Sequence, residues 1–177
     1  MRKQGFVFTL IVCLLSVGCN LRAGGSTVML KNTAVSVYLS PNGGAEEAVV
    51  DAIRAARQSI FVQAYSFTSA PISGALKAAH DRGIRVQVIL DKSQRTEHYS
   101  GMTYLQHAGV FVAVDAAHAI AHNKVMVIDG EIVITGSYNF SKAAEHSNAE
   151  NLLVIRDYGL AKIYKDNWTH HLQHSER

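Results

Sequence analysis

The sequence has few of the residues that define several common classes of protein. It contains 2 Cys among 177 residues, and both of them, Cys13 and Cys19, lie near the start of the chain. A chain that loses this segment has no thiol for a disulfide bond or a cysteine-ligated metal site. With 2 Pro, 18% charged residues and 48% hydrophobic residues, the composition excludes a disordered or proline-rich protein.

The chain also has little net charge. Its 17 Lys and Arg and 14 Asp and Glu give a formal charge of +3 at pH 7, but Arg2, Lys3 and Arg22 all precede position 24. The rest of the chain has 14 basic and 14 acidic residues. Bulk charge therefore does not indicate a nucleic-acid-binding protein, and any recognition of phosphate must come from a local site.

Residues 1–23 are typical of an export signal or lipoprotein leader. Arg2 and Lys3 precede the apolar run 6–15, which is shorter than the ~20 residues that a permanent membrane-spanning helix needs. We therefore expect a bacterial protein that is periplasmic or secreted.

Two processing sites are compatible with this leader, and an uncleaved anchor is a third alternative. Residues 21–23 (Leu-Arg-Ala) resemble a signal-peptidase site, which would release a chain beginning near Gly24. Residues 16–19 (Ser-Val-Gly-Cys) resemble a bacterial lipobox, although Ser16 stands where Leu is usual. Cleavage there would give a membrane-anchored lipoprotein, lipidated at Cys19.

The remaining chain is long enough for one compact domain. Residues 24–34 predict a short tether, and 35–177 predict the domain itself. Strand patterns occur at 35–39, 60–64, 84–90, 110–114, 124–129, 131–135 and 151–155, and helical patterns at 45–58, 69–83, 102–107 and 160–172. Residues 91–101 are expected to form a surface loop. This alternation, followed by a hairpin at 129–130, predicts an α/β fold with a mixed sheet sandwiched by helices.

Residues 121–139 carry the pattern with the clearest chemical meaning. His122 and Lys124 are two apart at the start of a strand, so their side chains point to the same side. The next strand returns to that side and brings Ser137 and Asn139 near them. Each of these residues taken alone would be interpreted as structural or solvated. Together, an imidazole, an ammonium and an amide form a nucleophile or acid beside two donors for phosphate oxygens.

The spacing resembles the HxK(x)4D(x)6GSxN motif of the phospholipase D superfamily. Every position is filled, by His122, Lys124, Asp129, Gly136, Ser137 and Asn139. The chain is also similar to the small bacterial Nuc-type endonucleases of that superfamily. That likeness covers roughly residues 35–172 and includes the segments 64–68, 78–88, 136–145 and 148–151. The resemblance implies a phospholipase D-like fold.

The resemblance also implies a role for each residue. His122 would be the nucleophile that forms a phosphohistidine, while Lys124 and Asn139 would hold non-bridging phosphate oxygens. Ser137 would support the histidine or the phosphate by hydrogen bonding. Glu150 is similar to a downstream carboxylate that accepts a hydrogen bond from the other ring nitrogen of the nucleophile and fixes its tautomer.

Asp129 is part of the motif, and the family suggests a structural, ion-pairing role for it. The sequence agrees, because an Asp before Gly at a hairpin is first of all a turn residue. The resemblance implies no cofactor and no metal, since attack by nitrogen removes the need for a metal-bound hydroxide. His170 and His174, four apart on the last helix, could bind a metal only weakly, and a solvated tail is the favoured interpretation.

The motif occurs once, whereas the family's chemistry needs two histidines. The resemblance therefore implies a homodimer whose two copies of His122 share one site, one of them neutral and the other protonated. We expect an exported, metal-independent phosphodiesterase that acts on nucleic acid as a nonspecific endonuclease, with DNA as substrate and RNA as a second candidate. The alternatives are a phospholipase D or cardiolipin hydrolase, and a catalytically idle nucleic-acid-binding module. Four basic residues could contact backbone phosphates or lie on a solvated edge: Arg82, Arg85, Lys92 and Arg95.

Overall fold

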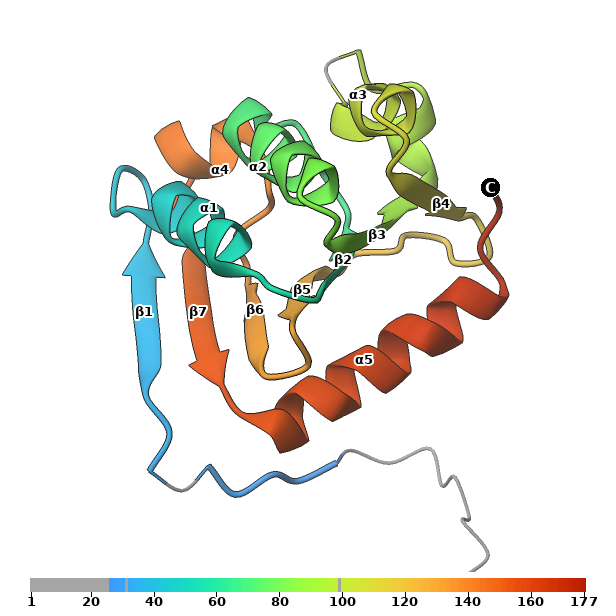
Figure 1. Cartoon of the computed structure of the whole chain (residues 1–177). Helices are drawn as coiled ribbons and strands as arrows, with labels where there is room; N and C mark the ends of the chain where they lie inside the picture. Colours follow the sequence, from blue (N-terminus) through green and yellow to red (C-terminus); the bar gives the residue numbers. More distant parts are fainter. Residues whose placement is uncertain (1–25, 31, 99) are drawn as a thin grey trace, which may run out of the picture.

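The computed structural model describes residues 26–30, 32–98 and 100–177. The predicted leader, 1–23, lies outside the described residues. In the described part, a seven-stranded mixed sheet is covered by helices on both faces, as Figure 1 shows. The α/β fold predicted from the strand and helix patterns is therefore confirmed.

The strands follow one another in the spatial order β1-β7-β6-β5-β2-β3-β4. Strands β2, β3 and β4 run parallel, and all the other neighbouring pairs are antiparallel. The strands are β1 (Val35–Leu39), β2 (Ser59–Ala64), β3 (Arg85–Asp91), β4 (Phe111–Asp115), β5 (Lys124–Ile128), β6 (Ile132–Gly136) and β7 (Asn151–Arg156). The α-helices are α1 (Ala45–Ala55), α2 (Ala70–Asp81), α3 (Gly101–His107), α4 (Lys142–His146) and α5 (Tyr158–Gln173).

The two faces of the sheet are buried by different helices. On one face, α1 and α2 place Ile53 and Leu76 against the apolar side chains of the central strands. On the other face, α5 crosses the sheet and buries Trp168 against Phe61 of β2. The indole N–H of Trp168 donates to the Val62 carbonyl at 2.9 Å, so this large side chain leaves no buried donor unpaired. Burial on both faces explains why every residue of β2 and β5 is buried and why most of these residues are apolar.

One edge of the sheet gathers chain segments that are far apart in the sequence. Lys124, the first residue of β5, pairs with Ala64, the last residue of β2. The end of β6 lies beside the start of β7, where Gly136 pairs with Leu152. Strands β3 and β4 also end at this edge, where Asp91 pairs with Asp115. We call it the Lys124 edge.

Three segments differ from the sequence-based expectation. The expected loop 91–101 contains a 3-10 helix at Lys92–Arg95, whose first turn is capped by the Asp91 side chain. Helix α4 has only five residues, too few for a periodic pattern, and Ser141 caps it. A third segment, part of the predicted tether, adds Val28 and Leu30 to the lining of a shallow hollow beside the first turns of α5. No helix in the described ranges is both long and apolar enough to cross a membrane.

Candidate active site

His122 and Lys124 stand at the Lys124 edge, as their spacing predicts. Lys124 begins β5 and is 8% exposed, whereas the side chain of His122 is exposed in the loop before it. The Lys124 Nζ atom donates to the His122 carbonyl oxygen at 3.0 Å. The His122 ring lies against the ring of Tyr65, with centroids 4.6 Å apart, and Lys124 Nζ is 5.1 Å from the Tyr65 centroid. A solvent-accessible imidazole thus lies directly beside a buried ammonium group.

The electrostatics of this pair depend on a third residue. Burial lowers the pKa of Lys124, and the carboxylate of Glu150 acts in the opposite direction. Glu150 therefore lies close enough to interact with the ammonium group. The site combines the ammonium group of Lys124 with a carboxylate that favours its charged form, a pairing that the sequence patterns did not predict.

The Gly136-Ser137 segment fits tightly against the start of β7. Gly136 has φ +149°, and a Cβ atom there would lie 2.2 Å from the Asn151 carbonyl oxygen. A residue without a side chain is therefore required at this crossing. The Ser137 Oγ atom accepts hydrogen bonds from the backbone N–H and the side-chain amide of Asn151, at 3.0 and 3.2 Å. The serine thus fixes the end of β6. Because its oxygen is the acceptor in both bonds, its hydroxyl proton can still be donated to another group.

Asn139 is held between two core residues, Tyr138 and Phe140, which are 1% and 0% exposed. The Phe140 carbonyl accepts the N–H groups of Thr68 and Ser69, which follow β2. The Oδ1 atom of Asn139 is buried without a hydrogen-bond partner. The same side-chain amide carries an NH₂ group, which is able to donate a hydrogen bond to a phosphate oxygen.

Glu150 lies within electrostatic reach of Lys124 but does not make the predicted contact with His122. Its Oε1 atom accepts a hydrogen bond from Asn148 at 3.1 Å. Its backbone is fixed to Ser40 by two hydrogen bonds, Ser40 N–H to the Glu150 carbonyl and Glu150 N–H to Ser40 Oγ. Ser40 follows β1, and the strand order separates β1 from β5 by β7 and β6. In the described residues, the hydrogen bonds of Glu150 therefore go to Asn148 and Ser40 and not to the imidazole.

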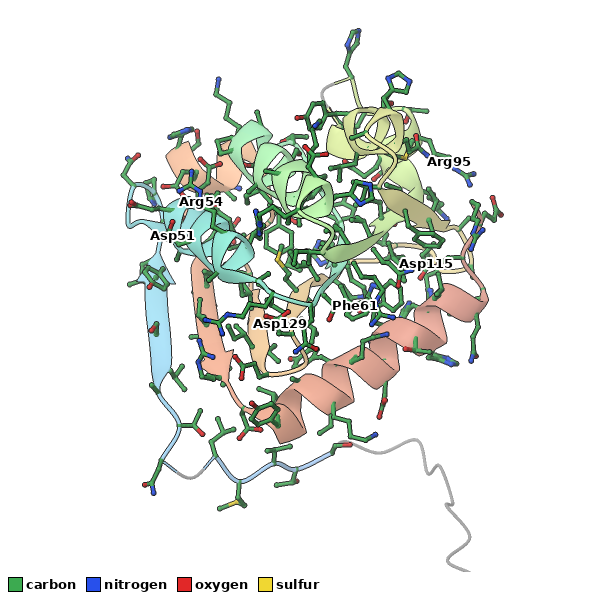
Figure 2. The ribbon with its side chains drawn as sticks, viewed as in Figure 1. Asp51, Arg54, Phe61, Arg95, Asp115 and Asp129 are labelled. Atoms are coloured by element: carbon green, nitrogen blue, oxygen red, sulfur yellow. The ribbon has the colours of Figure 1, made fainter. Side chains whose placement is uncertain are left out.

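Asp129 does not belong to the site, although it belongs to the motif. It follows β5 at the end opposite Lys124, where Figure 2 labels it. Its carboxylate accepts the backbone N–H groups of Arg57, Gln58 and Ser59 at 2.8–2.9 Å. Burial acts to raise the pKa of Asp129, but these hydrogen bonds outweigh it and lower the pKa. Although Asp129 is grouped with the catalytic residues by the motif, its carboxylate binds backbone amides around the start of β2. The expectation of a structural turn residue agrees with this position.

Two residues at the Lys124 edge were missed. Tyr65 provides the surface against which the His122 ring lies. Asp91, which is 2% exposed, accepts the Ala121 N–H at 2.7 Å and so fixes the residue before His122. An Asp directly after an apolar strand, at the carboxyl end of parallel strands, is the sequence signal that could have found it.

Of the four basic residues proposed for phosphate contact, two lie at the Lys124 edge and two lie near the opposite ends of the strands. Arg82 donates to the carbonyl oxygens of Ile53 and Arg54, and Arg85 begins β3 far from the Lys124 edge. Lys92 and Arg95 do lie at this edge, but they bind the His118 carbonyl oxygen and the Glu176 carboxylate. The ammonium group of Lys124 is therefore the cation that the site itself provides.

Comparisons with known proteins agree with this arrangement. Residues 49–172 match the family model described as cardiolipin synthase, PLD-like domain. A phospholipase D of Rickettsia bellii is 42% identical over 139 residues, covering 78% of this chain and 69% of the relative. A mitochondrial cardiolipin hydrolase of Xenopus tropicalis is 33% identical over 113 residues, covering 64% of this chain and 54% of the relative.

Two solved structures are similar over most of the domain. The phospholipase D family member Nuc from Salmonella typhimurium superposes with a TM-score of 0.79 and 37% identity, covering 81% of this chain and 97% of that chain. NucT from Helicobacter pylori gives a TM-score of 0.74 and 29% identity, with 81% and 98% covered. The family match, the sheet and the complete motif lead to one conclusion: this chain belongs to the phospholipase D superfamily and is a phosphodiesterase.

Proposed function

We propose that the protein is an exported endonuclease that hydrolyses phosphodiester bonds of nucleic acid through a phosphohistidine at His122. The observation that carries this proposal is the exposed imidazole of His122, which lies against Tyr65 and beside the buried ammonium of Lys124. The imidazole is accessible to a bulky phosphodiester, and the ammonium can bind the charge that develops on the phosphoryl oxygens.

The reaction takes place in two displacement steps. An unprotonated ring nitrogen of His122 attacks phosphorus, so that a P–N bond forms and the P–O bond to the leaving group breaks. A second, protonated histidine gives its proton to the leaving oxygen. That histidine then takes a proton from water, the hydroxyl attacks phosphorus, and the P–N bond breaks to release the phosphate monoester. Throughout both steps, Lys124 and the Asn139 amide bind the non-bridging oxygens.

We assign the second histidine to a second copy of the chain. The motif occurs once among 177 residues. His122 and Ser137 are exposed in the single chain, so a partner could approach the site across them. An isologous two-fold contact would place His122 opposite His122 of the partner subunit, with both copies of Lys124 and Asn139 around one phosphate.

One observation favours nucleic acid over lipid, namely the near-complete coverage of the solved proteins Nuc and NucT. Hydrolysis of phospholipid is the second candidate, favoured by the relatives called phospholipase D and cardiolipin hydrolase.

The substrate is tested by incubating the purified chain with plasmid DNA, RNA, cardiolipin vesicles and phosphatidylcholine vesicles, each in excess chelator. We expect nicked and fragmented nucleic acid and intact lipid. His122→Ala should abolish cleavage, whereas His107→Ala, which removes an exposed histidine at the end of α3, should not. Lipid hydrolysis alone would identify a phospholipase, and binding without cleavage would identify an idle module. Cleavage that survives His122→Ala would contradict the mechanism.

The exported location is a separate proposal, based on residues 1–23. We expect the mature chain from the native envelope to begin near Gly24 or at a lipidated Cys19, and either start would support export. Intact-mass measurement distinguishes the two, because lipidation adds the mass of acyl chains. A cytosolic chain that starts at Met1 would contradict it.

A further inference from the structure

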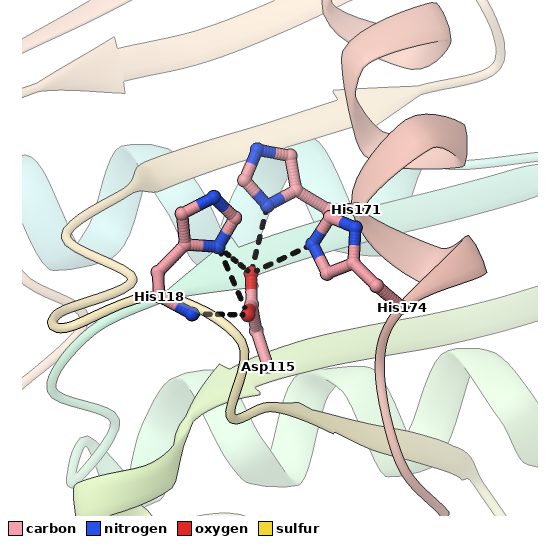
Figure 3. A group of neighbouring side chains, drawn as sticks. All are labelled: Asp115, His118, His171 and His174. Carbon is pink, nitrogen blue, oxygen red and sulfur yellow. Dashed lines mark hydrogen bonds and ion pairs between the residues drawn. The ribbon is translucent and has the colours of Figure 1, made fainter.

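A cluster of one carboxylate and three imidazoles lies outside the motif, at the far end of the Lys124 edge (Figure 3). Its members are Asp115 at the end of β4, His118 in the following loop, His171 in the last turn of α5, and His174, which caps that helix. The sequence favours a solvated tail over a weak metal site for His170 and His174. In the structure, His170 is exposed, while His174 turns toward Asp115.

The geometry of the cluster is that of ligands around a common centre. Asp115 Oδ2 lies 2.9 Å from His118 Nδ1, 2.8 Å from His171 Nδ1 and 3.4 Å from His174 Nε2. These candidate ligand atoms all lie within 4.8 Å of one another. A tetrahedral zinc site with bonds of ~2.0–2.1 Å requires ligand atoms about 3.3 Å apart. A small contraction or expansion of the cluster is therefore enough to enclose an ion.

Hydrogen bonding alone leaves this cluster incomplete. His118 and His171 are hydrogen-bonded to the Asp115 carboxylate, whereas His174 Nε2 is buried without a hydrogen-bond partner. Asp115 itself is fully buried, and burial of a carboxylate requires partners that neutralise it. A bound cation would be coordinated by the unpaired Nε2 atom of His174 and would neutralise the negative charge of the buried Asp115 carboxylate.

We propose that Asp115, His118, His171 and His174 form a structural binding site for a divalent zinc-class ion. Three imidazoles and one carboxylate satisfy the four-coordinate preference of zinc, while magnesium and calcium prefer oxygen ligands. Because all four positions are protein ligands, the site has no open coordination position for a substrate. This revises the expectation of no metal site and does not depend on the proposed nuclease activity.

The ion would join three segments that the sheet alone does not hold together. The ligands come from β4, from the loop that continues to His122, and from the end of α5. Neighbouring contacts support the same junction, because Val114 pairs with Glu176 and Arg95 forms an ion pair with Glu176 at 2.6 Å. The metal would therefore attach the C-terminal helix to the loop that presents the nucleophile.

Binding is measured directly, with Zn²⁺ as the probe. The chain, purified without a histidine tag and stripped by chelator, is titrated with Zn²⁺ in competition with a chromophoric chelator. We expect one ion per chain, with Mg²⁺ not competing. Co²⁺ should give the intense visible bands of tetrahedral coordination. At free Zn²⁺ about 100 times the dissociation constant, the midpoint of thermal unfolding should rise by about 5–10 °C.

Variants separate the cluster from an exposed histidine pair. His171→Gln retains an amide that can donate to Asp115 but removes the imidazole, so it should weaken Zn²⁺ binding by about 100-fold or more. His174→Ala should do the same, while His170→Ala on the same turn and His122→Ala in the active site should bind normally. Weakening by His170→Ala equal to that by His171→Gln would overturn the proposal. The proposal would also be overturned if His171→Gln and His174→Ala left the affinity for Zn²⁺ unchanged. Failure of the unmodified chain to bind Zn²⁺ would overturn it as well.

Discussion

The backbone N–H of Ala121 donates to the Asp91 carboxylate at 2.7 Å, and this bond joins the loop before the nucleophile to the carboxyl end of β3. The other oxygen of the same carboxylate accepts the Ser93 N–H at 2.8 Å. Burial would raise the pKa of Asp91, but these hydrogen bonds outweigh it and lower the pKa. Because His122 is exposed in a loop, its position depends on attachments of this kind.

Removing that attachment should reduce turnover by displacing His122. Asp91→Ala leaves two backbone N–H donors without their acceptor. Each buried donor left unpaired lowers the free energy of unfolding by about 1–3 kcal/mol. We expect kcat to fall by about tenfold, the effect of moderate misplacement of a catalytic group, with a smaller change in KM. Steady-state kinetics on plasmid DNA measure this split. Asp129→Asn, which perturbs the opposite end of β5, is the control for general destabilisation, and an equal loss of kcat in it would contradict the positioning role.

The two phosphate-binding groups should each have a large effect on the rate. Lys124→Ala and Asn139→Ala remove one donor to the phosphoryl oxygens, which we expect to lower kcat/KM by about 10²–10³-fold. Lys77→Ala, which removes an exposed lysine of α2, is the matched control.

A further substitution distinguishes charge from shape at Asn139. Asn139→Asp has the same size but would place a negative charge beside the phosphate, so its loss should exceed that of Asn139→Ala. Equal activity of Asn139→Asp and the unmodified chain would show that the amide does not bind phosphate.

Asp129 should affect stability and leave the chemistry intact. Its φ of +54° is a conformation that Asn tolerates, so Asp129→Asn removes the charge without new backbone strain. We expect a loss of about 1–2 kcal/mol in the free energy of unfolding, the low end for hydrogen bonds to a charged group, because two of the three donors are exposed to water. Urea denaturation at pH 7 measures this loss.

The pH dependence of stability provides a second test of Asp129. The folded-state pKa is below the ordinary value of 3.8, so the stabilisation is complete above pH 3.8 and disappears as the pH falls through the folded-state pKa. The difference between the unmodified chain and Asp129→Asn should therefore shrink below pH 3.8. A constant difference down to the lowest pH at which both chains remain folded would contradict this account.

The sequence predicts those parts of the site that neighbouring elements create. His122, Lys124, Ser137 and Asn139 lie on both arms of one hairpin, and strand periodicity with a tight turn is sufficient to bring them to one edge. The same periodicity places Asp129 at the opposite end of β5 from Lys124. The motif spacing alone does not reveal this separation, because it includes both residues in one pattern. Local patterns therefore predict both the site and the exception to it.

Contacts between distant segments were outside the reach of these patterns. Asp115 and His171 are 56 positions apart and meet only because β4 is an edge strand beneath the end of α5. The anchoring of Glu150 to Ser40 likewise depends on β1 pairing with β7, from the opposite end of the chain. The spatial order of strands decides these contacts, and the pattern within a single strand carries no information about that order.

The last prediction concerns the shared site and uses subunit mixing. If each dimer has one site built from both copies of His122, a mixed dimer with one His122→Ala chain lacks either the nucleophile or the acid. Activity should then follow the square of the fraction of unmodified chain. An equal mixture should retain about one quarter of the activity of an unmodified sample at equal total protein, assuming random two-fold pairing, whereas independent sites would retain about one half. The two chains are refolded together, and differently tagged species are separated to verify exchange.

Mixing with Asp129→Asn instead of His122→Ala is the control, because that variant should remain active in every pairing. A linear response in a verified exchanged sample would refute the two-histidine site, even if the single substitutions had supported the motif.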